Sequence, residues 1–217
     1  MSLDLDQIKS KVMKGTTTIG IVCQDGIVMG ADSRATADTF IASSEAIKVY
    51  KIDDALGVTI AGSVAYAEYV VKLLKLHNEH YKMSEGRPLT PSAASSLLSL
   101  VLQENANSFA IQFNIVQLII GGLNNGVPEL YDIDPLGGSI KDSKFFSSGS
   151  GSLTALGYLE GIYAPDITVD EAAKHTVKAL KIAMRRDSAT GDGIKLVAIT
   201  KKGFKEYQKE EIEKFAK

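Results

Sequence analysis

Gly15-Thr16 has the clearest chemical potential in this sequence, because it stands where a polar N-terminal segment gives way to the β-rich run Thr16 to Val22. If the bond between them were cut, Thr16 would become an N-terminal residue. Its hydroxyl is a weak nucleophile, but its own α-amine, with a reference pKa of about 7.7–8.0, can accept the hydroxyl proton near neutral pH. One residue would then supply nucleophile and base. The same residues also suit the ordinary start of a strand, and this stretch alone leaves both interpretations open.

An aspartate is predicted to lie near Thr16. Residues 16–24 and 27–33 form two predicted strands, and Asp25-Gly26 between them is typical of a tight hairpin. The end of the second strand then returns to the start of the first, which brings Asp32 close to Thr16. A carboxylate there can hold a lysine, although an aspartate that caps a turn beside Arg34 would give the same pattern.

Lys48 is the candidate partner for that carboxylate. It lies in a predicted strand, residues 46–52, with apolar neighbours on both sides. An ammonium in such a run either protects a solvated edge strand or is buried and needs an opposite charge. If Lys48 pairs with Asp32, its positive charge lies beside Thr16 and favours both the alkoxide and the unprotonated amine.

Two later loops carry further hydroxyl and carboxylate groups. Ser148 to Ser152 leads into a predicted helix over residues 153–163, so Ser150 can point back into a site. This loop lacks the Gly-Lys-Ser/Thr ending of a nucleotide-binding loop, which argues against phosphate binding. Asp187 and Thr190 follow a later predicted helix and offer a carboxylate and a hydroxyl that can approach an amine, although an ordinary glycine-rich loop after a helix would look the same.

The composition argues against several other functions. The chain has 217 residues, 45% of them hydrophobic, and a formal charge of −2, which is typical of a globular protein and gives no basic surface for nucleic acid. No apolar run is long enough for a membrane span. The single cysteine, Cys23, suits a reducing cytoplasm and is expected to be a buried, inert thiol. His77 and His80 share a helix face without a visible third ligand, so no metal site is expected.

The first half of the chain predicts strands followed by helices. Four early strands, at residues 16–24, 27–33, 46–52 and 56–61, suggest an antiparallel sheet. The Gly62-Ser63 junction opens a helix that runs to about Tyr81, and Thr90-Pro91 opens a second one.

The second half repeats this order. A long apolar strand at residues 115–123 is expected to be buried on both faces, and shorter strands follow at 129–134 and 144–147. Two helices come next, the second with a Thr168-Glu171 capping box, and then a hairpin from residue 194 and a charged tail from 208, for which a helix is one interpretation. This alternation predicts one α+β domain with helices stacked on antiparallel sheets.

Together, these motifs closely resemble those of proteasome β subunits, and the archaeal type fits best. In order they are Gly-Thr-Thr-Thr-Ile-Gly-Ile from residue 15, Ala-Asp-Ser-Arg-Ala-Thr from 31, the lysine at 48, Thr-Ile-Ala-Gly-Ser from 59, Gly-Ser-Gly-Ser from 149 and Arg-Asp-Ser-Ala-Thr-Gly-Asp-Gly from 186. The resemblance runs from about Met13 to the C-terminus. It implies the N-terminal-nucleophile hydrolase fold of the threonine hydrolases, a four-layer α/β/β/α sandwich of two antiparallel sheets between helical layers. It also implies self-cleavage between Gly15 and Thr16, so that residues 1–15 are a removable propeptide and residues 16–217 a single catalytic domain.

The resemblance further implies roles for individual residues. Thr16 would be the nucleophile and, through its amine, the base, and the Gly62 amide would be the oxyanion donor. The other implied catalytic residues are Asp32 and Lys48, the activating pair, and Ser150, Asp187 and Thr190, which support the amine. The substrate backbone would be bound by Thr36, Gly62 and Val64. A pocket would hold the substrate side chain that precedes the cleaved bond, and it would be lined by Ala35, Ala46, Tyr50, Ile60 and Val64. Glu68 would add a moderating charge to this pocket. This mostly apolar lining predicts a preference for apolar residues.

The chain departs from the family's usual pattern at three places. Thr190 stands where serine is usual, and its methyl group is expected to alter packing while its hydroxyl can keep a hydrogen bond. Ile47 stands where a second lysine is common, and Ala65-Tyr66-Ala67 replaces the usual Gly-Asp-Ala, which is expected to change the rim of the pocket. None of these changes removes the reacting group.

The implied activity is that of a threonine endopeptidase acting on unfolded proteins inside a cytoplasmic chamber. The chain would join other β subunits in stacked heptameric rings with α subunits, and a separate ATPase would supply unfolding. No cofactor, metal, nucleic acid or membrane is expected to take part.

Three alternatives stay open. The first is a catalytically silent or partner-dependent subunit that acts as a ring scaffold, although Thr16, Asp32 and Lys48 are all present and the Tyr-Asp motif of α subunits is absent. The second is the simpler bacterial threonine protease of hexameric unfoldases, which favours Gly-Asp-Gly-Gln around the position of Asp32. The third is a small-molecule amidase of the same fold, which the sequence does not exclude.

Overall fold

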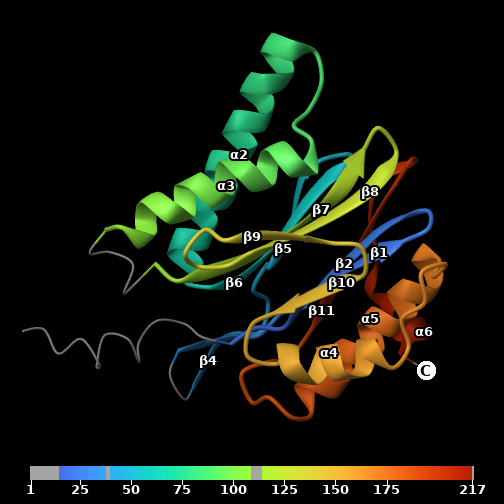
Figure 1. Ribbon diagram of the computed structural model, residues 1–217. Helices are drawn as coiled ribbons and strands as arrows, with labels where there is room; N and C mark the ends of the chain where they lie inside the picture. The colour runs from blue at the N-terminus through green and yellow to red at the C-terminus, as the bar shows by residue number, and fades with distance from the viewer. Residues whose placement is uncertain (1–14, 38–39, 109–113, 217) are drawn as a thin grey trace, which may run out of the picture.

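The computed structural model describes residues 15–37, 40–108 and 114–216 and places most of their strands in two five-stranded antiparallel sheets (Figure 1). The first sheet has the order β10 (Phe145–Ser148), β1 (Thr18–Cys23), β2 (Gly26–Asp32), β11 (Ile194–Thr200) and β12 (Gly203–Glu206). The second has the order β5 (Val49–Asp53), β6 (Leu56–Gly62), β7 (Val116–Asn124), β8 (Val127–Ile133) and β9 (Ser139–Asp142). A separate two-stranded sheet consists of β3 (Ala35–Ala37) and β4 (Phe40–Ser43).

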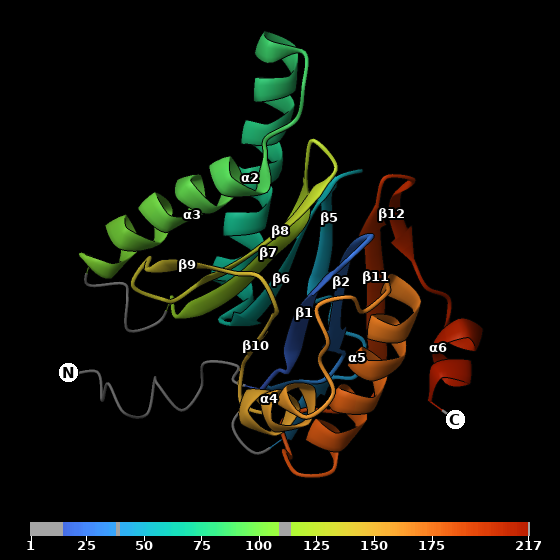
Figure 2. The same cartoon turned by 45° about the vertical axis from the view of Figure 1, so that its right-hand side comes forward.

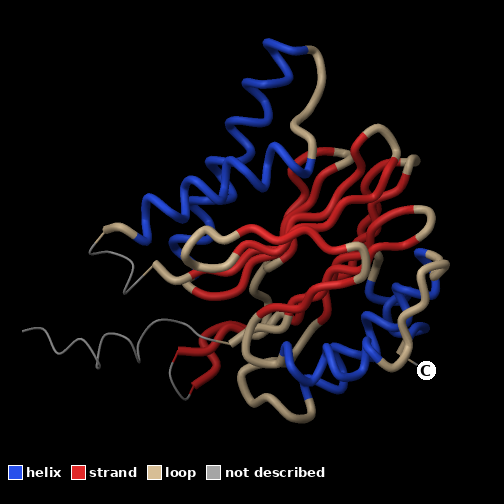
Figure 3. Tube along the Cα trace, in the orientation of Figure 1, coloured by secondary structure: helices blue, strands red, loops and turns tan. Residues whose placement is uncertain are grey.

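Helices cover the outer faces of the two sheets and make a four-layer sandwich (Figure 3). Helices α2 (Val64–Glu85) and α3 (Pro91–Ala106) pack on the second sheet, and α4 (Ser152–Glu160) and α5 (Val169–Met184) pack on the first. The short helix α6 (Lys209–Phe215) lies beside α5 (Figure 2). The predicted fold class, an α/β/β/α sandwich of two antiparallel sheets, is therefore confirmed. None of the helices in the described part of the chain is long and apolar enough to cross a membrane.

Three apolar clusters hold the four layers together, one at each boundary. Ile19 and Ile21 of β1 point toward α5, whereas Met29 of β2 and Ile119 of β7 meet between the sheets. Gly20 faces this middle layer, where a Cβ atom would lie 2.9 Å from the Ile119 side chain. The two sheets approach closely at this point because β1 carries no side chain there.

Several local expectations are confirmed. The β1–β2 hairpin forms, but its turn lies at Gln24-Asp25, one residue before the expected Asp25-Gly26, because Gly26 already pairs with Cys23 in the sheet. The Thr168–Glu171 capping box begins α5 as expected. Pro91 opens α3 behind the Thr90 cap. Helix α2 continues to Glu85, past its expected end, because Gly86 stops it with a left-handed backbone at φ 69°.

The strands differ from the prediction in three ways. The four early strands do not share one sheet: β1 and β2 lie in the first, where β11 is the second neighbour of β2, and β5 and β6 lie in the second. Lys48 is not in mid-strand but directly precedes β5, although its carbonyl still accepts a hydrogen bond from the Ile60 amide at 2.9 Å. The pair β3–β4 was not predicted, since both strands are short and β4 is exposed along its whole length, although β3 is largely buried.

Candidate active site

The centre of the candidate site is a buried ion pair between Lys48 and Asp32. Lys48 Nζ lies 2.8 Å from Asp32 Oδ1, and the side chains are 6% and 0% exposed. The hairpin brings Asp32 to the start of β1, where the Asp32 amide donates to the Thr17 carbonyl at 3.2 Å. Burial lowers the pKa of Lys48, and the neighbouring Asp32 carboxylate opposes this effect. An ammonium held so close to a carboxylate in a dry site is a concentrated positive charge with a fixed position.

Asp32 is held by three backbone amides in addition to Lys48. Its Oδ1 accepts from the Thr17 amide at 2.9 Å, and its Oδ2 accepts from the amides of Arg34 at 3.1 Å and Gly191 at 3.0 Å. These donors come from the residue before β1, from the segment after β2 and from the loop before β11, so one carboxylate joins three segments of the chain. Four donors to two oxygens fix the orientation of the carboxylate.

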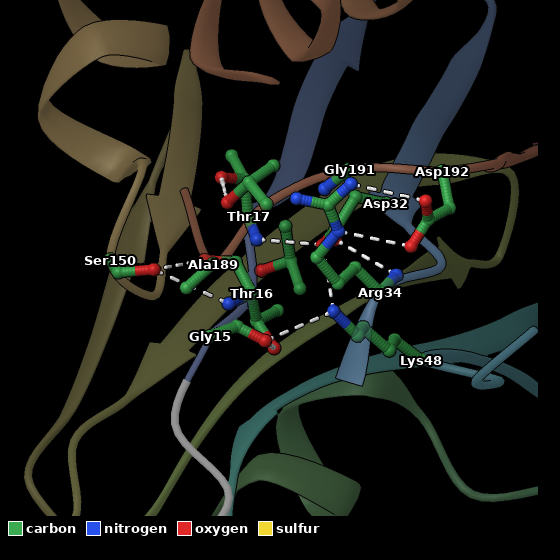
Figure 4. A network of polar contacts seen from close by, with 12 residues as sticks. Gly15, Thr16, Thr17, Asp32, Arg34, Lys48, Ser150, Ala189, Gly191 and Asp192 are labelled. Carbon is green, nitrogen blue, oxygen red and sulfur yellow. Dashed lines mark hydrogen bonds and ion pairs between the residues drawn. The ribbon is translucent and has the colours of Figure 1, made fainter. Parts of the chain in front are cut away.

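Lys48 also reaches the peptide bond that precedes Thr16. Its Nζ donates to the Gly15 carbonyl oxygen at 3.1 Å, and Thr16 Oγ1 contacts the same oxygen at 2.5 Å (Figure 4). Gly15 has φ 151°, and a Cβ there would lie only 2.5 Å from the Ala189 side chain and 2.7 Å from Thr36 Oγ1. Position 15 therefore has room only for glycine, and the hydroxyl and ammonium converge on its carbonyl group.

On the other side of Thr16, a serine and an aspartate approach its nitrogen. Ser150 Oγ lies 3.4 Å from the Thr16 nitrogen and 2.5 Å from Asp187 Oδ2. Thr190 Oγ1 contacts the same Asp187 oxygen at 2.5 Å, so its hydroxyl keeps a hydrogen bond where serine is usual in the resembling family. Burial works to raise the pKa of Asp187, but the hydrogen bonds from Ser150 and Thr190 outweigh it, and the pKa is lowered. Asp187 is therefore a carboxylate at neutral pH.

A cavity of about 360 Å³ opens beside Thr16. All seven residues that the sequence assigns to substrate binding lie on its wall: Ala35, Thr36, Ala46, Tyr50, Ile60, Gly62 and Val64. Glu68 lies on the wall as well, and it forms a 3.3 Å ion pair with Lys72 one helical turn further along α2. Gly62 ends β6 with φ 120°, one residue before the Ser63 cap of α2, so its amide lies where strand meets helix.

Sequence reasoning missed several residues of the site. Arg34 pairs with both carboxylate oxygens of Asp192, at 3.0 and 3.1 Å, and donates to the Ser188 carbonyl at 2.8 Å, which ties the 187–193 loop to the end of β2. The available signal was an arginine two residues after Asp32 and an aspartate two residues after Thr190, which can pair if the two loops meet. Ala42 and Ser43 of β4 also line the cavity. They were missed because β4 itself was not predicted.

Two other groups have no part in this site. His77 and His80 lie on the exposed part of α2, and the residues in the described ranges hold no cluster of three or more potential metal ligands. Cys23 is buried, and burial together with the nearby Asp25 charge raises the pKa of its thiol to about 12. Such a thiol stays protonated and unreactive, as the sequence predicts.

A sandwich of two antiparallel sheets between helical layers, with a threonine at the head of its first strand, is the fold of the N-terminal-nucleophile hydrolases. A model of the family described as "Proteasome subunit" matches residues 12–199. The chain belongs to this family.

Archaeal proteasome β subunits are among the relatives of this chain. A "Proteasome subunit beta" of Archaeoglobus fulgidus is 44% identical over 209 residues, covering 96% of this chain and 96% of the relative. Proteins of the same name from Methanosarcina mazei and Methanocaldococcus fervens are 44% and 46% identical, over 93% and 94% of this chain and 94% and 89% of the relatives. The chain is therefore a proteasome core subunit similar in length to these β subunits.

Proposed function

We propose that this chain is a threonine endopeptidase that frees its own nucleophile by cutting the Gly15–Thr16 bond. The observation that carries the proposal is the convergence of Lys48 Nζ and Thr16 Oγ1 on the Gly15 carbonyl oxygen, at 3.1 and 2.5 Å. Asp32 holds the ammonium from the far side at 2.8 Å. These distances support both the cleavage step and the later attack on substrates, because the same charge would stabilise the oxyanion or the alkoxide.

The self-cleavage step starts from the hydroxyl of Thr16. Its oxygen attacks the Gly15 carbonyl carbon and gives up its proton, and the carbon–nitrogen bond breaks as the Thr16 nitrogen takes up that proton. The Gly15 acyl group is then an ester on Thr16 Oγ1. Water hydrolyses this ester and leaves a carboxylate on Gly15, a free amine and a free hydroxyl on Thr16. Lys48 stabilises the negative charge that develops on the carbonyl oxygen.

The freed amine then becomes the base for peptide hydrolysis. It takes the proton of its own hydroxyl while the oxygen attacks a substrate carbonyl, and the leaving amine of the substrate receives that proton. The Gly62 amide, on the cavity wall at the start of α2, is proposed to bind the oxyanion. Water then hydrolyses the acyl ester and restores Thr16.

The remaining proposals concern the setting of the reaction. Subunits of this family assemble with other proteasome subunits. We infer stacked heptameric rings of β subunits capped by α subunits, cytoplasmic in location, with a separate ATPase that delivers unfolded proteins. No cofactor or metal enters the steps above. Residues 1–15 are proposed to be the removable segment and 16–217 the catalytic domain.

The experiment that tests this function compares the wild-type chain with Thr16→Ala, each assembled with the α subunit. The wild-type particle is expected to hydrolyse short fluorogenic peptides. A particle in which every copy of this chain carries Thr16→Ala is expected to be inactive. Assembly is verified by size-exclusion chromatography. Equal hydrolysis by the two particles would refute the role of Thr16. An assembled wild-type particle without activity would instead favour a silent or partner-dependent scaffold subunit.

The cavity wall leads to a prediction about peptide preference. Its side chains are mostly small or apolar, so we expect faster cleavage after apolar residues than after charged ones. Glu68→Gln removes the acidic group that the described residues place on the wall and is expected to slow cleavage after basic residues, about two- to fivefold, because an exposed charge is well screened. Glu79→Gln, on the same helix but not on the wall, is the control. A fluorogenic peptide panel measures both, and equal effects of the two variants would contradict the assignment of Glu68.

A further inference from the structure

Thr17, the residue after the proposed nucleophile, has no part in the steps described above, yet its hydroxyl makes a buried hydrogen bond. The residue is fully buried, and Thr17 Oγ1 lies 2.7 Å from Oγ1 of Thr190, which is fully buried as well. Thr190 Oγ1 contacts Asp187 Oδ2, the oxygen that Ser150 also reaches. A continuous chain of polar groups therefore runs from Thr17 through Thr190 and Asp187 to Ser150, which lies beside the Thr16 nitrogen.

The direction of each hydrogen bond in this chain follows from counting protons. Asp187 is a carboxylate, which only accepts, so Ser150 and Thr190 both donate to it. Each hydroxyl has one proton. Because Thr190 gives its proton to Asp187, Thr17 must be the donor in the 2.7 Å contact with Thr190. By the same count, Ser150 Oγ turns only lone pairs toward the Thr16 nitrogen, 3.4 Å away.

The surroundings leave Thr17 little freedom to turn away from Thr190. Gly151, at the start of α4, packs directly on the Thr17 hydroxyl, and a Cβ atom at Gly151 would overlap Thr17 Oγ1 and lie 3.1 Å from Thr190 Oγ1. The Thr17 amide donates to Asp32 Oδ1 at 2.9 Å, as the close view shows (Figure 4). Thr17 thus contacts the Asp32–Lys48 side of the site through its backbone and the Asp187 side through its hydroxyl.

We propose that Thr17 is a positioning residue, whose hydroxyl holds Thr190 and, through it, Asp187 in the orientation that aims the Ser150 lone pairs at the Thr16 amine. Hydrogen bonds in such a buried chain polarise and strengthen one another, so the first donor affects the last acceptor. Without it, the Thr190 oxygen would lose its donor in a dry site. This inference rests on the proposed function, since it concerns the orientation of the amine as a base.

The test compares three variants as processed, assembled particles. Thr17→Val, which keeps the shape but removes the donor, is expected to lower kcat about tenfold with little change in KM. Thr17→Ser is expected to restore most of the rate. Thr18→Val is the matched control. Thr18 Oγ1 lies 2.6 Å from Ser148 Oγ in an equally buried pair, which does not belong to the series of hydrogen bonds from Thr17 to Ser150. This control is expected to stay within about twofold of the wild type.

A double-mutant cycle with Thr190→Val separates positioning through Thr190 from a general structural effect. If Thr17 acts through Thr190, adding Thr17→Val to Thr190→Val lowers kcat no further. A full tenfold loss in that background would overturn the proposal, and so would a Thr17→Val particle as active as the wild type.

Thr17→Ala is a second variant that also lacks the donor, for use if Thr17→Val does not assemble. Failure of both to assemble would assign Thr17 a purely structural role and overturn the proposal too. A wild-type particle that does not hydrolyse peptides would refute the proposed function itself, and this outcome is distinct from the others.

Discussion

Replacing Lys48 by methionine is expected to abolish peptide hydrolysis and self-cleavage while the chain still folds and assembles. The change removes the only side-chain cation within hydrogen-bonding distance of the Gly15 carbonyl among the residues described. Loss of one preorganised donor to an oxyanion typically costs about 10²- to 10³-fold in rate, and in the proposed mechanism Lys48 also stabilises the alkoxide. Folding is expected to survive because Asp32 keeps three backbone N–H donors.

The matched control is Lys51→Met. Lys51 lies three residues further along the chain in β5, but its side chain is half exposed and pairs with Asp54. This variant is expected to process itself and to hydrolyse peptides at the wild-type rate. Single-turnover cleavage of a fluorogenic peptide and a gel of the purified chain measure both activities. If Lys48→Met turned over peptides as fast as Lys51→Met, Lys48 would have no place in the mechanism.

Asp32→Asn is expected to remove activity and to destabilise the fold as well. The amide has one oxygen where the carboxylate has two, so its NH₂ group would face backbone N–H donors that now point at Asp32. The substitution Asp32→Asn also leaves the Lys48 ammonium buried without an opposite charge at Asp32. Breaking a buried ion pair in this way costs roughly 3–5 kcal/mol in the free energy of unfolding. Urea unfolding of the purified chain measures that loss.

The double variant Asp32→Asn with Lys48→Met separates stability from chemistry. Removing the unpaired ammonium is expected to recover part of the lost free energy of unfolding, because a neutral pair no longer carries a buried charge. Activity is expected to stay absent. The account of the pair would be wrong if the double variant were less stable than Asp32→Asn alone, or if it regained peptide hydrolysis.

Much of this fold was predictable because its local signals agree with its tertiary structure. Asp25-Gly26 predicts the hairpin that returns Asp32 to Thr16, and the junction at Gly62-Ser63 predicts the start of α2. The resemblance implies catalytic roles for residues far apart in the sequence. The structure brings Lys48 to Asp32, and Ser150 and Thr190 to Asp187, on two sides of Thr16.

What the sequence could not supply is the partition of strands between sheets and the contacts that depend on it. No local pattern shows that β2 pairs with β11 in one sheet while β5 and β6 belong to the other sheet. Arg34 and Thr17 were missed for the same reason, since their partners Asp192 and Thr190 lie more than 150 residues away in the chain. Such pairings are set by tertiary packing, which propensity and spacing do not encode.

The central claim, that Thr16 becomes an N-terminal nucleophile by self-cleavage, is tested most directly by intact-mass spectrometry of the chain after assembly with the α subunit. The account predicts a wild-type species that begins at Thr16 and a Thr16→Ala species that keeps residues 1–15. A wild-type chain that retains residues 1–15 in a particle that nonetheless hydrolyses peptides would contradict it.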